Sequence, residues 1–100
     1  MRRIRVDDLP WTTPAAGIRS KSIVDGVQTI RLVEFAQDFA EAEWCCKSHT
    51  GYVLAGVLEV TFSDSTEVFS AGDVVVIRHS DRHRARVIEG PVRLFLVEPA

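Results

Sequence analysis

The sequence has no long apolar run and no N-terminal segment of the kind that directs secretion. Of its 100 residues 46% are hydrophobic, but no stretch approaches the roughly 20 consecutive apolar residues with which a helix crosses a bilayer. The first residues, Met-Arg-Arg-Ile-Arg-Val-Asp-Asp, lack the apolar centre of a secretory signal. We therefore expect a cytoplasmic protein with no membrane partner.

Cysteine is also scarce. Cys45 and Cys46 are the only two, and they are adjacent. Neighbouring cysteines close a disulfide only through a strained ring, so this pair is poorly suited to a structural crosslink. In a reducing compartment both are expected to remain free thiols.

Charge of neither sign dominates the chain. Twelve Lys and Arg stand against 14 Asp and Glu, which gives a formal net charge of −2 and an isoelectric point near 5.9. This balance argues against a nucleic-acid or acidic-membrane partner. Basic residues do gather between Arg78 and Arg86, and we interpret them as a solvated face. The length predicts one domain, residues 1–100, large enough to bury a real interior.

Helical periodicity is nearly absent, and strand patterns recur through the chain. Asp25-Gly26 separates two β-rich runs and predicts a hairpin. Gly56 interrupts another run, which indicates a bend or bulge. The segment Phe35 to Ala42 could hold a helical turn. Many short strands with Gly and Pro between them predict an all-β barrel with little or no helix. The expected strands are 17–24, 27–35, 41–46, 51–62, 66–70, 74–77, 83–88 and 92–97.

Alternation within the strands assigns faces to their side chains. His83 is in phase with Ala85 and Val87, so it is expected to point inward. Near the C-terminus, Phe95 and Val97 stand opposite the inward set. An outer face that carries apolar groups needs a cover, and we predict that a second copy supplies it in a homodimer.

Two stretches of the sequence resemble the two conserved motifs of the cupin superfamily. The first remnant covers about residues 37–56 and includes Tyr-Val-Leu-Ala-Gly-Val-Leu-Glu-Val; the second covers about residues 72–87 and begins Gly-Asp. This resemblance implies a jelly-roll β-barrel of the RmlC-like kind, with one interior pocket. It also implies a divalent metal in the barrel mouth, which cupins usually hold with three histidines and one glutamate.

Only one of those ligand positions keeps the family residue. Aligned on Gly72, the second motif places His83 on the family histidine. In the first motif, aligned on Gly56, the usual pair of histidines falls on Glu43 and Cys45, and the usual glutamate on His49. The resemblance thus implies a metal site made from Glu43, Cys45, His49 and His83. Such a set suits Fe, Ni or Zn, and a thiolate favours Zn or Fe over Mg or Mn.

The function implied is the binding of a small molecule at that metal. Dioxygenase, isomerase or decarboxylase chemistry would fit the resemblance, and the fold does not choose among them or show that the protein is an enzyme. Tyr52 stands where many cupins have an aromatic residue, either as core or with its hydroxyl in the pocket. The alternative is a barrel that has lost its metal and serves as a ligand-binding or sensory module without catalysis.

Overall fold

The computed structural model describes residues 3–100, and these residues form an all-β structure, as the alternation patterns predict. The one helical element among them is a three-residue 3-10 turn, η1 (Val6–Asp8). The strands are β1 (Thr12–Ala15), β2 (Ile18–Asp25), β3 (Gln28–Phe35), β4 (His49–Phe62), β5 (Thr66–Ser70), β6 (Val74–Ile77) and β7 (His83–Pro99). None of the described residues forms a helix long and apolar enough to cross a membrane.

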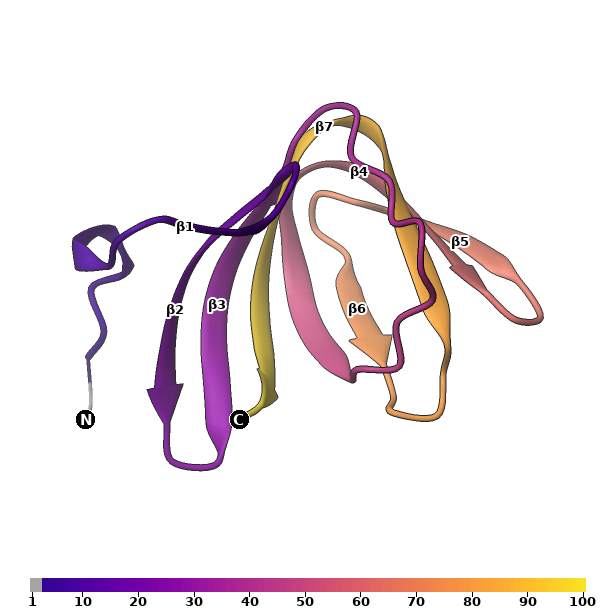
Figure 1. Ribbon diagram of the computed structural model, residues 1–100. Helices are drawn as coiled ribbons and strands as arrows, with labels where there is room; N and C mark the ends of the chain where they lie inside the picture. The colour runs from indigo at the N-terminus through magenta and orange to yellow at the C-terminus, as the bar shows by residue number, and fades with distance from the viewer. Residues whose placement is uncertain (1–2) are drawn as a thin grey trace.

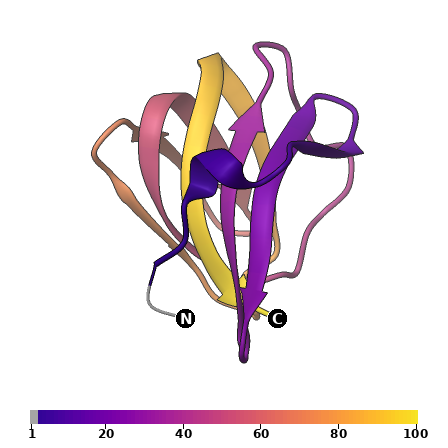
Figure 2. The ribbon, with the colours of Figure 1, turned by 90° about the vertical axis from the view of Figure 1, so that its left-hand side faces the viewer.

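Two long strands, β4 and β7, connect the two halves of the barrel. The strand order is β1-β2-β3-β7-β4-β5, and β6 adds to the first half of β4. β6 pairs with residues 49–52 of β4, whereas β5 pairs with residues 57–61. One half of the barrel therefore contains β2, β3 and β6, and the other contains β5. The sheet curves back on itself between them (Figure 1, Figure 2).

Gly56 allows the two long strands to bend where they cross. The pairing register of β4 with β7 shifts between Val53 and Leu58, and Gly56 adopts a φ of +83°. A Cβ atom at this position would lie 2.6 Å from the carbonyl oxygen of Pro91. Only glycine tolerates both the backbone angle and the close approach. The bend predicted at this residue is confirmed.

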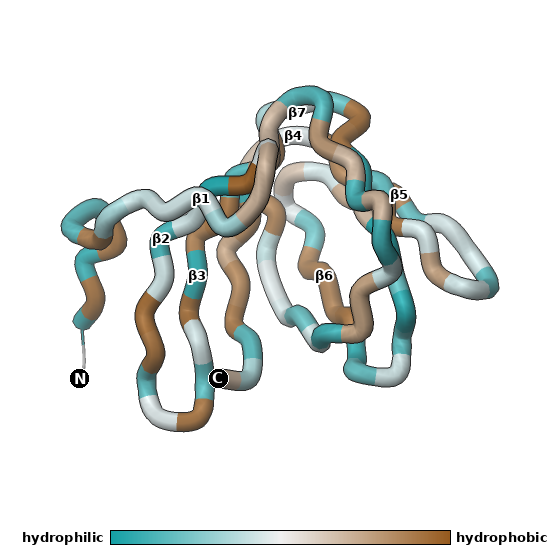
Figure 3. The backbone as a smooth tube through the Cα atoms, viewed as in Figure 1, coloured by the Kyte–Doolittle hydropathy of each residue, from teal (hydrophilic) through white to brown (hydrophobic). Residues whose placement is uncertain are grey.

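The interior contains the residues that alternation assigns to it. Val33, Val53, Val60 and Val92 are almost completely buried, and His83, Ala85 and Val87 all face inward from β7. Apolar colour accordingly recurs at intervals along the strands, and the connecting turns are mostly hydrophilic (Figure 3).

Four details differ from the sequence-based expectation, and the first is β1, which lies outside every expected strand. Residues 83–88 and 92–97 belong to one continuous strand, β7, because the chain bends at Gly90-Pro91 without leaving the sheet. Residues 41–46 do not form a strand: two isolated bridges, Ala40–Arg86 and Cys45–His83, tie this irregular segment to β7. Between Phe35 and Ala42 the chain makes a single hydrogen-bonded turn, in which the N–H of Phe39 donates to the carbonyl oxygen of Ala36 at 3.0 Å, and no helix.

Candidate metal centre at the barrel mouth

Three of the four predicted ligands meet at one end of the barrel. His49 begins β4 in one half of the barrel and His83 begins β7 in the other. Their rings lie edge to face, with centroids 5.2 Å apart. The backbones of Cys45 and His83 exchange two hydrogen bonds of 2.8 and 3.0 Å, which hold the cysteine beside the histidine. One ligand atom from each of the three residues lies within 4.8 Å of the others.

Glu43, the fourth predicted ligand, is exposed and does not belong to this cluster. The irregular segment explains its position. Ala40 pairs with Arg86 and Cys45 pairs with His83, so the segment advances five residues while β7 advances three. The two extra residues bulge from the barrel and carry Glu43 away from the interior. The neighbouring Trp44 also lies outside, where it packs against the guanidinium of Arg84 at 4.5 Å.

Tyr52 does not line the interior either. His49, Gly51 and Val53 face inward from β4, so Tyr52 is out of phase with them and 45% exposed. Its partners in the neighbouring strands are Val74 and Phe95, both on the outer face. The prediction of a pocket residue at this position is not supported by its placement.

Each histidine of the cluster is oriented through its Nδ1 atom. His49 Nδ1 is hydrogen-bonded to Glu98, and His83 Nδ1 lies 3.0 Å from the carbonyl oxygen of Asp81. A carbonyl or an ionised carboxylate can only accept, so each Nδ1 carries the proton. Nε2 of each neutral ring then keeps its lone pair. His49 Nε2 is 4.0 Å from Cys45 Sγ, on the side where the three residues meet.

Glu98, the carboxylate that binds His49, remains ionised. Burial raises its pKa, but the hydrogen bond with His49 and the charge of Arg31 outweigh that effect and lower the pKa below its usual value of 4.5. Arg31 Nε lies 2.7 Å from Glu98 Oε1. Glu98 is not among the predicted site residues, because the expected strand ends at Val97. Alternation continued by one residue would have placed Glu98 on the inward face with Leu94 and Leu96.

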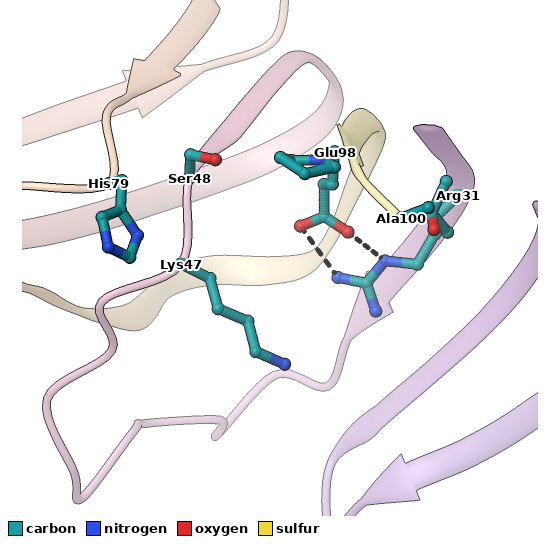
Figure 4. A pocket seen from close by; sticks show the side chains of 8 residues that line it. Arg31, Lys47, Ser48, His79, Glu98 and Ala100 are labelled. Atoms are coloured by element: carbon teal, nitrogen blue, oxygen red, sulfur yellow. Dashed lines mark hydrogen bonds and ion pairs between the residues drawn. The ribbon is translucent and has the colours of Figure 1, made fainter. Parts of the chain in front are cut away.

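A further acidic residue, Glu41, lines the interior cavity with both histidines. Its Oε1 accepts a hydrogen bond of 3.0 Å from the backbone N–H of Ala85. This cavity holds about 50 Å³ and its other walls are apolar. A larger hollow of about 490 Å³ opens at the mouth, where Glu98 forms part of its wall (Figure 4).

The donor set fits a soft divalent ion. Two imidazole nitrogens and one thiol are ligands that Zn and Fe accept, and three protein ligands leave a position open. Ligand atoms around a tetrahedral ion lie roughly 3.5 Å apart, so binding would draw these side chains together by roughly 1 Å. The oriented Nδ1 atoms are the support that metal-binding histidines need.

The curved sheet, the glycine bend and the histidines at its mouth define a β-barrel of the cupin class. A family model described as "Cupin domain" matches residues 46–98, and the chain belongs to this family. No curated protein sequence matches the chain.

Solved structures support the same fold over nearly the whole chain. KdgF from Halomonas sp. superposes with a TM-score of 0.77 at 23% identity, over 94% of this chain and 91% of that one. An RmlC-like cupin from Shewanella frigidimarina gives 0.77 at 16% identity, over 100% and 92%. The polyketide cyclase RemF from Streptomyces resistomycificus gives 0.75 at 21% identity, over 99% and 79%. At these identities the likeness concerns the fold alone.

Proposed function

We propose that this cupin binds a small molecule at a divalent transition metal, Fe, Ni or Zn, held by Cys45, His49 and His83. The observation that carries the proposal is the orientation of the two histidines. Both Nδ1 atoms are occupied by fixed acceptors. His49 Nε2 lies 4.0 Å from the cysteine sulfur, and one ligand atom from each of the three residues lies within 4.8 Å of the others. His83 is 3% exposed, and a metal is a partner that its second nitrogen can take.

At such a site, different residues of the chain would orient the ligating histidines, exclude water and accommodate the small molecule. Glu98 holds His49 in one tautomer, and the Asp81 carbonyl does the same for His83. The apolar walls of the inner cavity exclude bulk water, and the hollow at the mouth has the room for a ligand that the inner cavity lacks. A bound metal would act as a Lewis acid toward that ligand. Chemistry of the dioxygenase, isomerase or decarboxylase type is the catalytic form of this proposal.

Metal content after reconstitution tests the proposal. The protein is incubated separately with Zn(II), Ni(II) and, without oxygen, Fe(II), then desalted and measured by elemental analysis. We expect about one ion per chain, because the site offers one set of ligands. His49→Ala and His83→Ala should each abolish retention, and Cys45→Ser should weaken it strongly. Co(II)-loaded protein should show a thiolate-to-metal charge-transfer band that Cys45→Ser removes.

Two matched controls separate ligand loss from general damage. Cys46→Ser makes the same chemical change one residue away, at an exposed thiol outside the cluster, and should leave retention intact. Glu43→Ala should do so too, because its side chain lies outside the barrel. If the wild-type protein retains none of the three metals, the pocket is a metal-free ligand-binding or sensory site and the proposal is wrong.

A further inference from the structure

The basic residues of this protein fall into two groups, paired and unpaired. Among residues 3–100, the arginines that form ion pairs are Arg19 and Arg93 with Glu34, Arg31 with Glu98, and Arg86 with Glu59. The basic residues beside the metal cluster form none. We define these residues beside the cluster as the basic rim; it consists of Lys47, Arg78, His79, Arg82 and Arg84. Lys21 forms no ion pair either, but it lies on β2.

The basic rim comes from two segments that meet at the cluster. Lys47 follows Cys45 by two residues, and the other members lie in the turn from β6 to β7 and at the start of β7. The bridge between Cys45 and His83 joins the two segments. Arg82 and Arg84 pack on Trp44 at 4.8 and 4.5 Å, one residue before Cys45 in the chain. In residues 43–47 and 78–84 the lysine and arginines of the rim stand against the carboxylates of Glu43 and Asp81, while the chain as a whole carries a net charge of −2. The excess of positive charge is therefore local.

Two members of the rim line the 490 Å³ hollow at the mouth. Figure 4 shows Lys47 extending into it between His79 on one side and the Arg31–Glu98 pair on the other. Both carboxylate oxygens of Glu98 are already engaged, because Arg31 contacts both of them and His49 also binds Oε2. The side-chain groups left for a ligand are therefore mainly donors, among them the Lys47 ammonium and the Ser48 hydroxyl.

We propose that the ligand of this mouth is a small organic anion. Its carboxylate or phosphate group contacts Lys47 and Ser48, and its remainder extends toward Cys45, His49 and His83. The contact of the anionic group with Lys47 and Ser48 rests on the charge of the rim alone. The direction of the remainder toward the cluster rests on the proposed function. The rim raises the local concentration of anions, and Lys47 supplies a charge-assisted hydrogen bond once the anion is seated.

Titrations followed by amide chemical shifts test the proposal on both the Zn(II)-loaded and the metal-free protein. Succinate and glycerol 3-phosphate are the anionic probes, and 1,4-butanediol and glycerol are their neutral counterparts. We expect saturable shifts at residues 47, 48 and 79 with the anions and none with the neutral compounds. Lys47→Gln should weaken anion binding about tenfold, and added salt should weaken it in the wild type.

Lys21→Gln is the matched control, because Lys21 is the other lysine of the chain and lies on β2, close to Trp11. It removes the same charge from the whole molecule and should leave anion affinity unchanged. Equal losses in both variants would reduce the effect to net charge and overturn the proposal. Absence of binding by both anions, or equal binding of the neutral compounds, would overturn it as well.

The outcomes for the metal and for the anion can be read separately. Anion binding that depends on Lys47 in the metal-free protein, together with no metal retention, would support the basic mouth and refute the metal site. Metal retention without any anion preference would do the reverse. A single dominant response to only one probe would identify whether carboxylate or phosphate is the group recognised.

Discussion

Glu98 is the residue that connects the surface of the mouth to the metal cluster. It lies between Arg31, whose positive charge favours the ionised carboxylate, and His49, whose Nδ1 proton it accepts. The lowered pKa of Glu98 means that the carboxylate stays ionised at neutral pH. An ionised acceptor behind a ligating histidine fixes the ring and increases the basicity of its other nitrogen.

Replacing this carboxylate should weaken the metal site without removing a ligand. We predict that Glu98→Gln lowers Zn(II) affinity by about tenfold, because an amide can still accept the hydrogen bond but carries no charge. Competition against a chromophoric chelator measures the effect. Glu59→Gln, which removes a carboxylate paired with Arg86 on the barrel surface, should leave the affinity unchanged. Identical affinities for wild type and Glu98→Gln would show that His49 needs no charged support.

At the scale of strands, one row of charges ties together β2, β3 and β7. The pairing register places Arg19, Glu34 and Arg93 side by side on neighbouring strands. Glu34 contacts both guanidinium groups, at 2.9 and 3.0 Å. The hydrogen bond from Arg19 is the largest influence on the pKa of Glu34; burial opposes it, Arg93 adds to it, and the pKa is lowered from 4.5.

A lowered pKa makes this row a source of pH-dependent stability. A carboxyl that is more acidic in the folded state stabilises the fold above its unfolded pKa, and this contribution is lost as the pH falls through the folded value. We predict that Glu34→Gln lowers the free energy of unfolding by about 1 kcal/mol or less near neutral pH. The difference from wild type should shrink as the pH falls through the lowered pKa of Glu34.

Urea unfolding at a series of pH values measures this difference. Glu67→Gln, an exposed carboxyl on β5, provides a control variant in which little change is expected at any pH. A gap between wild type and Glu34→Gln that stays constant from neutral to acidic pH would assign the effect to packing, and the charge row would contribute nothing.

The whole molecule presents an apolar outer face on the half of the barrel that contains β6. Val74, Tyr52, Phe95 and Leu32 form a row across β6, β4, β7 and β3, and the first three are exposed. A contiguous apolar row of this kind is an expected place for association. The homodimer predicted from Phe95 and Val97 remains a prediction, and this face is where we place it.

Two exposed valines allow this face to be compared with exposed apolar surface elsewhere on the barrel. Val74 is 59% exposed on β6 and Val68 is 56% exposed on β5, in the other half of the barrel. We predict a dimer by light scattering at concentrations of about tens of micromolar. Val74→Lys should give monomers, because it places a charge in the interface, while Val68→Lys should not. A wild-type monomer under these conditions would contradict the prediction.

The sequence by itself determined most of the strands, apart from β1 and residues 41–46, and which way most of their side chains point. Period-two alternation is a property of each strand alone, so it placed His83 inward with Ala85 and Val87, and it placed Phe95 outward. The glycine at position 56 marked the bend for a similarly local reason. The two motif remnants were sufficient to identify the cupin family.

Only the tertiary structure decided which residues form the site. Between Ala40 and Cys45 the chain has two residues more than the strand beside it, and this excess turns Glu43 outward while Cys45 stays at the cluster. Alternation cannot be continued through such a bulge, because the phase after it depends on the partner strand. The contact between His49 and Glu98 joins residues 49 positions apart. It follows from the register of β4 against β7, which depends on how the two strands pair in space.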